Sequence, residues 1–341
     1  MSWDIELAPA THPGDAIDTH VHLFTKPLLL EIAERPETPE RFRQAIKEGK
    51  WGRRGDTLPD MTAEQAACWY AERLAGADVA KALVVSVMPD SQYMRDFIVA
   101  AKGHVHALCN VDPRDPGSPQ LLEREMAAGF RGVKLYPVNR SFRLSDPACR
   151  PFFEKASELK ANMIIHYGVT VDPTGDLRYA DPLDLSPVAR DFPNVQFVIA
   201  HFGAGWLDSV LRLAYQCKNV CVDTSGTNNW MDYYVPKMTL AEVFERALMA
   251  MGPERVLFGT DSGTTAPYRT WIRRMQQRTI EEMGLSDADR DLIMRGNAAR
   301  IFRLDEPVAP GADGAPAGYA SPAADDEPAP GNASPADADP S

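Results

Sequence analysis

The sequence lacks the features that would place this chain in or across a membrane. It contains no apolar run of about 18 residues, the length that a membrane-spanning helix requires. Its first 15 residues carry neither a basic start nor an apolar stretch, so we expect no secretory signal. Together these absences favour a cytoplasmic protein with no membrane partner.

Positive charge and cysteine are also scarce. The chain has 36 Lys and Arg against 48 Asp and Glu, which gives a net charge of -12. This excess of negative charge argues against nucleic acid as the main partner and leaves a small-molecule substrate. The five cysteines are odd in number and irregularly spaced, so we interpret them as free thiols in a reducing compartment.

Large apolar side chains are nearly absent from the end of the chain. Residues 306–341 consist mostly of Pro, Ala, Gly, Ser and acidic residues. Such a segment cannot bury enough apolar surface to offset the entropy lost on ordering. We therefore expect a folded domain over residues 1–305 and a disordered acidic tail over 306–341.

Short β-branched runs alternate with longer amphipathic segments through the rest of the chain. Many of these segments begin after Ser, Thr or Asp and end near Gly, as helices do. Eight runs predict strands, at residues 16–22, 81–88, 104–111, 131–137, 162–168, 195–201, 219–225 and 255–261. Strands that each precede a helix predict an α/β protein with a parallel sheet, either open and doubly wound or closed into a barrel.

The number of strands favours the closed arrangement, a (β/α)8 TIM barrel. No glycine-rich phosphate loop follows the first predicted strand, which argues against a dinucleotide-binding sheet. The first crossover is unusually long and forms an insertion over residues 23–61. Because it leaves the carboxyl end of the first strand, we expect it to cover the active-site face as a lid or as a homodimer contact.

Histidine is rare in this chain, yet four of the seven histidines fall at predicted strand ends. His20 and His22 lie two apart on the first strand and so share a face, either as metal ligands or as unrelated polar residues. His166 and His201 end the fifth and sixth strands, and Asp261 ends the eighth. The carboxyl ends of barrel strands meet at one rim, and a divalent cation there would offset the cost of burying Asp261.

A second pair of histidines has the same spacing in a different place. His104 and His106 stand at the start of the third predicted strand, which puts them at the opposite rim of a barrel. We therefore expect that these two residues do not bind the metal ion.

Several motifs, taken in order, resemble the amidohydrolase superfamily. They are "IDTHVH", "IIHYG", "VIAHFGAG", "LFGTDS" and "IMRGNAARIF". The chain is similar to the amidohydrolase-related branch, which includes aminocarboxymuconate-semialdehyde decarboxylase and related metal-dependent hydrolases. The resemblance covers residues 16–303.

The resemblance implies a set of metal ligands and a catalytic pair. It implies that His20, His22, His166 and Asp261 bind one divalent ion, with zinc preferred and manganese or iron as alternatives. It also implies that His201 orients or activates the metal-bound water or contacts the substrate. Asp261 would accept the proton of that water, so His201 and Asp261 are the expected catalytic residues.

Five further residues are candidates for substrate binding. Lys134, on the fourth predicted strand, is interpreted as the partner of a substrate carboxylate; the alternatives are a carboxylated bridge between two metals and an interior ion pair. Arg140 and Arg178 lie in the loops that follow, where they would hold an acidic substrate unless they are ordinary surface residues. Asn228 and Trp230 belong to "TSGTNNWMDYY", which is either a substrate-contacting loop or simply an ordered one.

The preferred hypothesis is a metal-dependent hydrolase. A metal-activated water would attack an amide, ester or lactone carbonyl of a small, carboxylate-bearing substrate. The same site would suit a non-oxidative decarboxylase, or a hydratase, of an aromatic or unsaturated carboxylic acid. A catalytically silent barrel is a further alternative, but all four ligand positions are intact, which argues against it.

Overall fold

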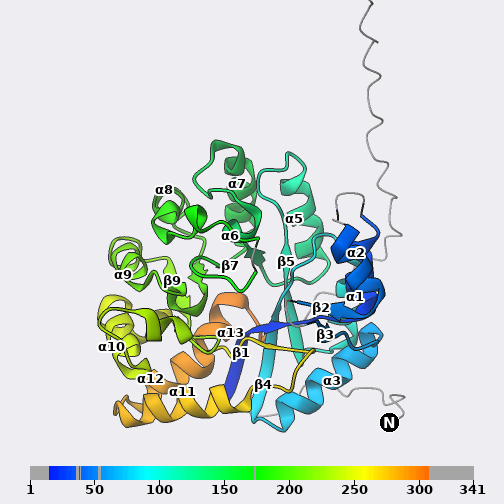
Figure 1. Cartoon of the computed structure of the whole chain (residues 1–341). Coiled ribbons are helices and arrows are strands. Elements are labelled where there is room, and N and C mark those ends of the chain that lie inside the picture. Colours follow the sequence, from blue (N-terminus) through cyan, green and yellow to red (C-terminus); the bar gives the residue numbers. More distant parts are fainter. Residues whose placement is uncertain (1–14, 36–37, 39, 53–54, 173, 307–341) are drawn as a thin grey trace, which may run out of the picture. The chain divides into compact units, whose positions relative to one another are not determined.

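The computed structural model describes residues 15–35, 38, 40–52, 55–172 and 174–306 (Figure 1). Apart from Glu306, the predicted tail lies outside these residues. Nine parallel strands form one sheet, surrounded by helices. In spatial order they are β10 (Val256–Leu257), β9 (Val220–Asp223), β8 (Phe197–Ile199), β7 (Met163–Ile165), β6 (Val133–Leu135), β5 (Val105–Asn110), β4 (Val79–Val85), β1 (Ala16–His22) and β11 (Ser262–Gly263).

The eighth strand of the barrel is split into two pieces that close the sheet. β10 pairs with β9, whereas β11 pairs with β1 at the far edge, where Val21 is the register partner of Ser262. Between the two pieces, the Asp261 N–H donates to the His20 carbonyl at 2.8 Å. The sheet therefore closes on itself, and the predicted TIM barrel is confirmed.

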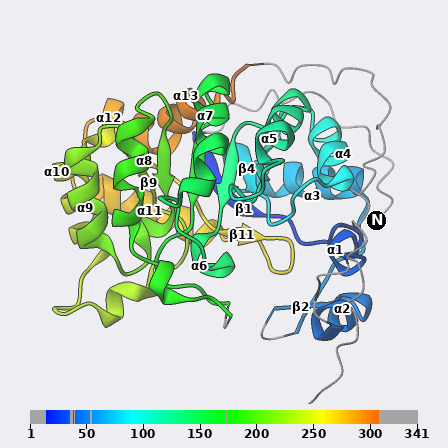
Figure 2. The same ribbon diagram turned by 90° about the horizontal axis from the view of Figure 1, so that it is seen from above.

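Helices cover the outer face of the sheet, as Figure 2 shows from above. They are α3 (Ala63–Ala75), α4 (Gln92–Ala100), α5 (Ser118–Ala127), α7 (Arg150–Leu159), α8 (Ser186–Asp191), α9 (Leu207–Gln216) and α10 (Leu240–Met251). Short α6 (Pro137–Arg140) follows β6 directly. Beyond the last strand come α11 (Thr270–Glu282), α12 (Asp287–Asp291), a π-helical turn (Leu292–Gly296) and α13 (Asn297–Phe302). Capping boxes begin α3 and α10, where Thr62 and Thr239 satisfy the first backbone N–H groups.

Apolar side chains form two main layers, one between sheet and helices and one inside the barrel. Branched residues from successive strands, such as Leu83, Leu108 and Ile164, fill the interior. Ile301 and Phe302 of α13 pack onto the same cluster. Since this interior is packed, polar chemistry is confined to the two ends of the barrel.

The insertion over residues 23–61 contains α1 (Lys26–Ala33), α2 (Glu40–Lys47) and a hairpin of β2 (Lys50–Trp51) with β3 (Asp56–Thr57). At its start, the Phe24 ring stacks on the His22 ring with centroids 5.3 Å apart. The Trp51 ring lies 5.6 Å from that of Phe24. The insertion thus reaches the barrel end that carries His22.

Two findings bear on the expected environment of the protein. None of the described helices has the length and apolar character needed to cross a membrane. All five cysteines are free and buried, so the structure forms no disulfide.

Candidate metal centre

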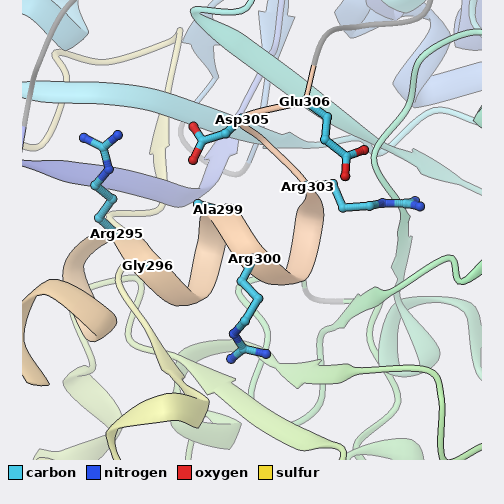
Figure 3. A pocket seen from close by; sticks show the side chains of 7 residues that line it. All are labelled: Arg295, Gly296, Ala299, Arg300, Arg303, Asp305 and Glu306. Carbon is cyan, nitrogen blue, oxygen red and sulfur yellow. The ribbon is translucent and has the colours of Figure 1, made fainter.

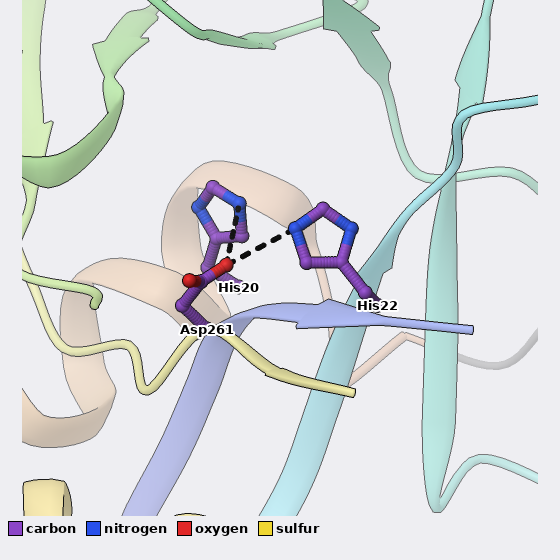
Figure 4. Close-up of side chains that lie close together, drawn as sticks. All are labelled: His20, His22 and Asp261. Atoms are coloured by element: carbon purple, nitrogen blue, oxygen red, sulfur yellow. Dashed lines mark ion pairs between the residues drawn. The ribbon is translucent and has the colours of Figure 1, made fainter. Parts of the chain in front are cut away.

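Three predicted ligands meet at the carboxyl end of the barrel. His22 Nε2 lies 3.1 Å from Asp261 Oδ1, and His20 Nε2 lies 4.0 Å from the same oxygen (Figure 4). One ligand atom from each of the three residues falls within 4.8 Å of the others. Both histidines come from β1, and Asp261 comes from the segment between β10 and β11. That segment turns sharply at Asp261, whose φ of 58° is left-handed.

The atoms of this cluster fit a divalent cation. His20 Nε2 is buried and has no hydrogen-bond partner, an arrangement that is costly unless a ligand supplies one. Burial, together with the charge of Lys134, lowers the pKa of His20 to about 3, so its imidazole is neutral at pH 7. Neutral imidazoles and a carboxylate suit zinc, manganese or iron.

His166 lies beside this cluster rather than within it. Its ring centroid is 5.0 Å from that of His201, whose ring is in turn 4.8 Å from that of His20. The Nε2 atom of His166 contacts the Val169 carbonyl at 3.2 Å. If Nε2 donates there, Nδ1 is left as the ligating atom, as in many metal-bound histidines. Burial holds the pKa of His166 well below its usual value.

His201 follows β8 on a backbone with a left-handed φ of 56°. Its Nδ1 atom lies 3.1 Å from the Ser225 carbonyl and 2.8 Å from Ser225 Oγ. These contacts occupy one side of the ring and leave Nε2 for water or substrate. Gly226 lies beside the Nδ1 side of the ring, where a Cβ would come within 3.3 Å of His201 Nδ1.

Asp223, at the end of β9, connects several of these residues, and the sequence analysis assigned it no role. Its carboxylate accepts from His20 Nδ1 at 2.8 Å and from the backbone N–H groups of His201 and Ser225 at 3.0 Å. Burial acts to raise the pKa of Asp223, but the charge and hydrogen bond of His20 outweigh it and lower that pKa. Asp223 therefore fixes the His20 tautomer in which Nε2 is free to coordinate.

The sequence analysis assigned no role to two other charged residues near the centre, Asp18 and Arg269. Asp18 accepts hydrogen bonds from Thr260 Oγ1 at 2.5 Å and from Tyr268 Oη at 2.7 Å, so it ties β1 to the last strand instead of joining the ligands. Burial raises the pKa of Asp18 to about 6. Arg269 Nη1 lies 3.1 Å from Asp261 Oδ2. No motif marks Tyr268 or Arg269: the partner of Tyr268 is 250 residues away, whereas that of Arg269 is 8 residues earlier.

Lys134 and Tyr136 lie in and just after β6. The Lys134 side chain is fully buried, and its Nζ atom has no hydrogen-bond partner. Burial lowers the pKa of Lys134 to about 8, although the negative charges of Asp223 and Asp261 act to raise it. The ammonium, which predominates at pH 7, lies 5.0 Å from the centroid of the Tyr136 ring.

The two predicted substrate-binding arginines differ in position. Arg140 is partly buried and donates a hydrogen bond to the side chain of Asn110, at the end of β5. Arg178 is 82% exposed and forms an ion pair with Asp176, its neighbour two residues earlier. Arg178 is therefore oriented toward a local partner and solvent.

Asn228 and Trp230 are joined to each other. The Trp230 indole donates to Asn228 Oδ1 at 3.0 Å, and Asn228 Nδ2 donates to the Thr224 carbonyl at 3.1 Å. Both side chains are buried. These contacts order the loop after β9 and occupy the polar groups that the sequence analysis proposed for substrate.

The second histidine pair lies at the opposite end of the barrel. Burial lowers the pKa of His106 to about 3, and the charges of Arg131 and Lys81 act in the same direction. Among the described residues, neither His104 nor His106 belongs to a group of side chains able to hold a metal ion.

A surface pocket of about 430 Å³ lies beside α13 (Figure 3). None of the predicted site residues lines it. Its walls are formed by Arg295, Gly296, Ala299, Arg300, Arg303, Asp305 and Glu306.

Comparison with known proteins places the chain in a family. The family pattern described as Amidohydrolase matches residues 17–304, nearly the whole described region. The chain therefore belongs to the amidohydrolase family, as the motifs implied.

Among curated proteins, the chain is 30% identical over 204 residues to 2-keto-4-carboxy-3-hexenedioate hydratase from Sphingobium sp.. That match covers 52% of this chain and 58% of the hydratase.

Solved structures share the fold at low sequence identity. The 5-carboxyvanillate decarboxylase of Sphingomonas paucimobilis has a TM-score of 0.59 at 17% identity, covering 84% of this chain and 98% of that one. A dihydroxybenzoic acid decarboxylase from Polaromonas sp. JS666, solved with manganese and an inhibitor, has a TM-score of 0.57 at 15% identity; the match covers 85% of this chain and 97% of that one. A Pseudomonas putida protein described as a 2-pyrone-4,6-dicarboxylic acid hydrolase has a TM-score of 0.57 at 18% identity; the match covers 85% of this chain and 98% of that one.

Proposed function

We propose that this chain is a metal-dependent hydrolase that acts on an amide, ester or lactone carbonyl of a small, carboxylate-bearing substrate. The observation that carries the proposal is the meeting of three ligand atoms: His20 Nε2, which is buried without a hydrogen-bond partner, and His22 Nε2 lie 4.0 Å and 3.1 Å from Asp261 Oδ1. Family membership supports it, and so does the shared fold of a protein described as a 2-pyrone-4,6-dicarboxylic acid hydrolase, since a 2-pyrone is a lactone.

Four residues would hold the ion: His20, His22, His166 and Asp261. A divalent ion bound there supplies a water whose pKa is lowered to about 7 and polarises the carbonyl under attack. Zinc is the first metal to test, and manganese is the second because it is bound in a related decarboxylase.

The remaining steps belong to the protein's own side chains. Asp261 accepts a proton through its carboxylate, while its second oxygen stays paired with Arg269. His201 would use Nε2 to orient the attacking water, because its Nδ1 is held by Ser225, and Asp261 would pass the proton it took from that water to the leaving group. Lys134 receives the carboxylate of the substrate, and Arg140, Arg178, Asn228 and Trp230 are secondary candidates for contacts with it.

Decarboxylation or hydration at the same centre is the second candidate function. The 30% identity to a hydratase and the structural likeness to two decarboxylases favour it. In that reaction His201 or Asp261 would protonate the carbon that loses carbon dioxide. We further propose that the enzyme works in the cytoplasm, where its five free cysteines stay reduced, and that it forms a homodimer through the insertion.

Elemental analysis followed by a substrate screen tests these proposals. The purified protein should carry a stoichiometric divalent metal, whereas a catalytically silent barrel should not. Release of acid from lactones, esters or amides would support the hydrolase, and release of carbon dioxide from aromatic or unsaturated acids would support the decarboxylase.

The division between ligands and catalyst has its own test. His201→Ala should keep the metal and lose turnover. If the substitution instead strips the metal, His201 is a ligand and the roles given above are wrong.

A further inference from the structure

We infer that Lys134 and Tyr136 form a carboxylate-binding subsite beside the metal centre, in which the ammonium and the phenol hydroxyl together receive an acid group of the ligand. The assignment of that ligand as the substrate rests on the proposed function. Binding of a carboxylate at this place depends only on the protein.

The geometry provides two donors at one place. Lys134 lies within β6, and Tyr136 follows that strand directly at the start of α6. The Lys134 Nζ atom lies 5.0 Å from the centroid of the Tyr136 ring. The Tyr136 ring is in turn 6.4 Å from the ring of His166, which places the pair beside the predicted ligands.

Both polar atoms are buried without a partner. Neither Lys134 Nζ nor Tyr136 Oη makes a hydrogen bond to the described residues. A buried donor left unpaired costs about 1–3 kcal/mol, and more when it is charged. Native proteins rarely place two such atoms next to each other unless something binds them. A carboxylate, with two acceptor oxygens, matches an ammonium and a hydroxyl at once.

The charges around the centre favour an anion once a metal ion is bound. In the metal-free protein, the Lys134 ammonium and the Arg269 guanidinium balance the carboxylates of Asp223 and Asp261. A divalent ion would add two positive charges, and a bound carboxylate would reduce that excess, whereas a neutral ligand of the same shape would not. A preference for an anion in the metal-free protein would therefore come from the unpartnered donors themselves.

Binding of benzoate and benzamide provides the test, since the two probes share a shape and differ in charge. Isothermal titration would be carried out on metal-free and on metal-loaded full-length protein. The variants are Tyr136→Phe, which removes only the hydroxyl, and Lys134→Met, which removes the charge. Lys218 and Tyr215 offer a matched control, because they form a surface pair with Nζ 5.6 Å from the ring centroid.

The wild type should prefer benzoate over benzamide in the metal-free protein, where no ion can account for it. Tyr136→Phe should weaken benzoate binding by about tenfold, the value of one hydrogen bond to a charged group, and weaken benzamide binding less, because the amide oxygen is a neutral acceptor. Lys134→Met should abolish the preference. Lys218→Met and Tyr215→Phe should leave both affinities unchanged.

Equal affinity for the two probes in the wild type, or unchanged benzoate affinity in Tyr136→Phe, would overturn the inference. Tyr136→Phe is nearly isosteric, so it keeps the test decisive even if Lys134→Met fails to fold. If the benzoate preference depends on both residues but no substrate in the screen is turned over, the subsite stands and the proposed function falls.

Discussion

The two ends of the barrel carry histidine pairs of identical spacing in opposite surroundings. At the carboxyl end, His20 and His22 meet the carboxylate of Asp261. At the amino end, the charged groups that act on His106 include the cations Lys81 and Arg131. Imidazoles two residues apart thus occur in both places, but among the described residues only the pair at the carboxyl end belongs to a group of side chains able to hold a metal ion.

The comparison teaches that neighbours, rather than spacing, decide what a histidine pair does. The amino-end cations already have partners: Lys81 Nζ donates to the Leu304 carbonyl at 2.6 Å and pairs with Asp305 at 2.7 Å. Arg131 likewise donates to the Glu306 carbonyl at 2.6 Å. These bonds fasten the segment after α13 across the barrel end, so that end serves stability, as is usual in this fold.

The largest expected difference between the ends is in metal affinity. His20→Ala removes a proposed ligand and should weaken metal binding by more than the roughly 10–100-fold that loss of an outer hydrogen-bond partner costs. His106→Ala is the control and should leave affinity unchanged. Chelator competition measures both. A metal-free His106→Ala protein, or a His20→Ala protein that keeps its metal, would contradict the comparison.

Asp223→Asn tests whether the neighbours of His20 matter as argued. An amide in place of the carboxylate no longer fixes the Nδ1–H tautomer of His20, so metal affinity should fall by about 10–100-fold. The same chelator competition measures it, with circular dichroism to establish that the fold is retained. Unchanged affinity would show that His20 needs no partner at Nδ1.

A substitution at the amino end should alter stability alone. Lys81→Met leaves the Leu304 carbonyl and Asp305 without their partner, so the free energy of unfolding should fall by about 1–3 kcal/mol. Urea unfolding measures this loss, and metal affinity should be that of the wild type. A change in metal affinity would mean that the two ends are coupled.

The smallest effect, when counted per pH unit, is a dependence of stability on acidity. The pKa of His106 is about 3 in the folded protein, below the usual value near 6.5 that applies once the chain unfolds. Between these values the unfolded state binds the extra proton, so wild-type stability falls as the pH drops from 6.5 toward 3. His106→Leu lacks this contribution and should lose about 1 kcal/mol less than the wild type per pH unit. Urea unfolding of the metal-free proteins at several pH values would detect it; parallel curves would exclude it.

The sequence predicts the parts of this site that depend on local patterns. Alternating apolar runs locate the strands, and the rule that barrel chemistry lies at carboxyl ends selects His20, His22 and Asp261 from them. The predicted strand 255–261 extends beyond β10, which ends at Leu257, and the left-handed backbone at Asp261 that precedes β11 is signalled by no residue type.

The sequence alone does not predict which residues far apart in the chain come into contact. Tyr268 and Asp18 are 250 residues apart, and the bond between Asp223 and His20 spans 203. No local pattern links such residues. The ion pair of Arg178 is different: Asp176 stands two residues earlier, a spacing that could have indicated a local partner for that arginine.

The split eighth strand has a consequence for the order of folding. The ligands from β1 and the one beside β11 are about 240 residues apart, and they meet only where the sheet closes, as the Asp18–Thr260 bond across 242 residues illustrates. Contacts of such long range form slowly, because a long loop must be closed before they can stabilise the chain. A nascent chain that still lacks its last strand would therefore have an incomplete ligand set. A metal ion bound by the proposed ligands would then stabilise only the finished barrel and would add its binding free energy to the final closure.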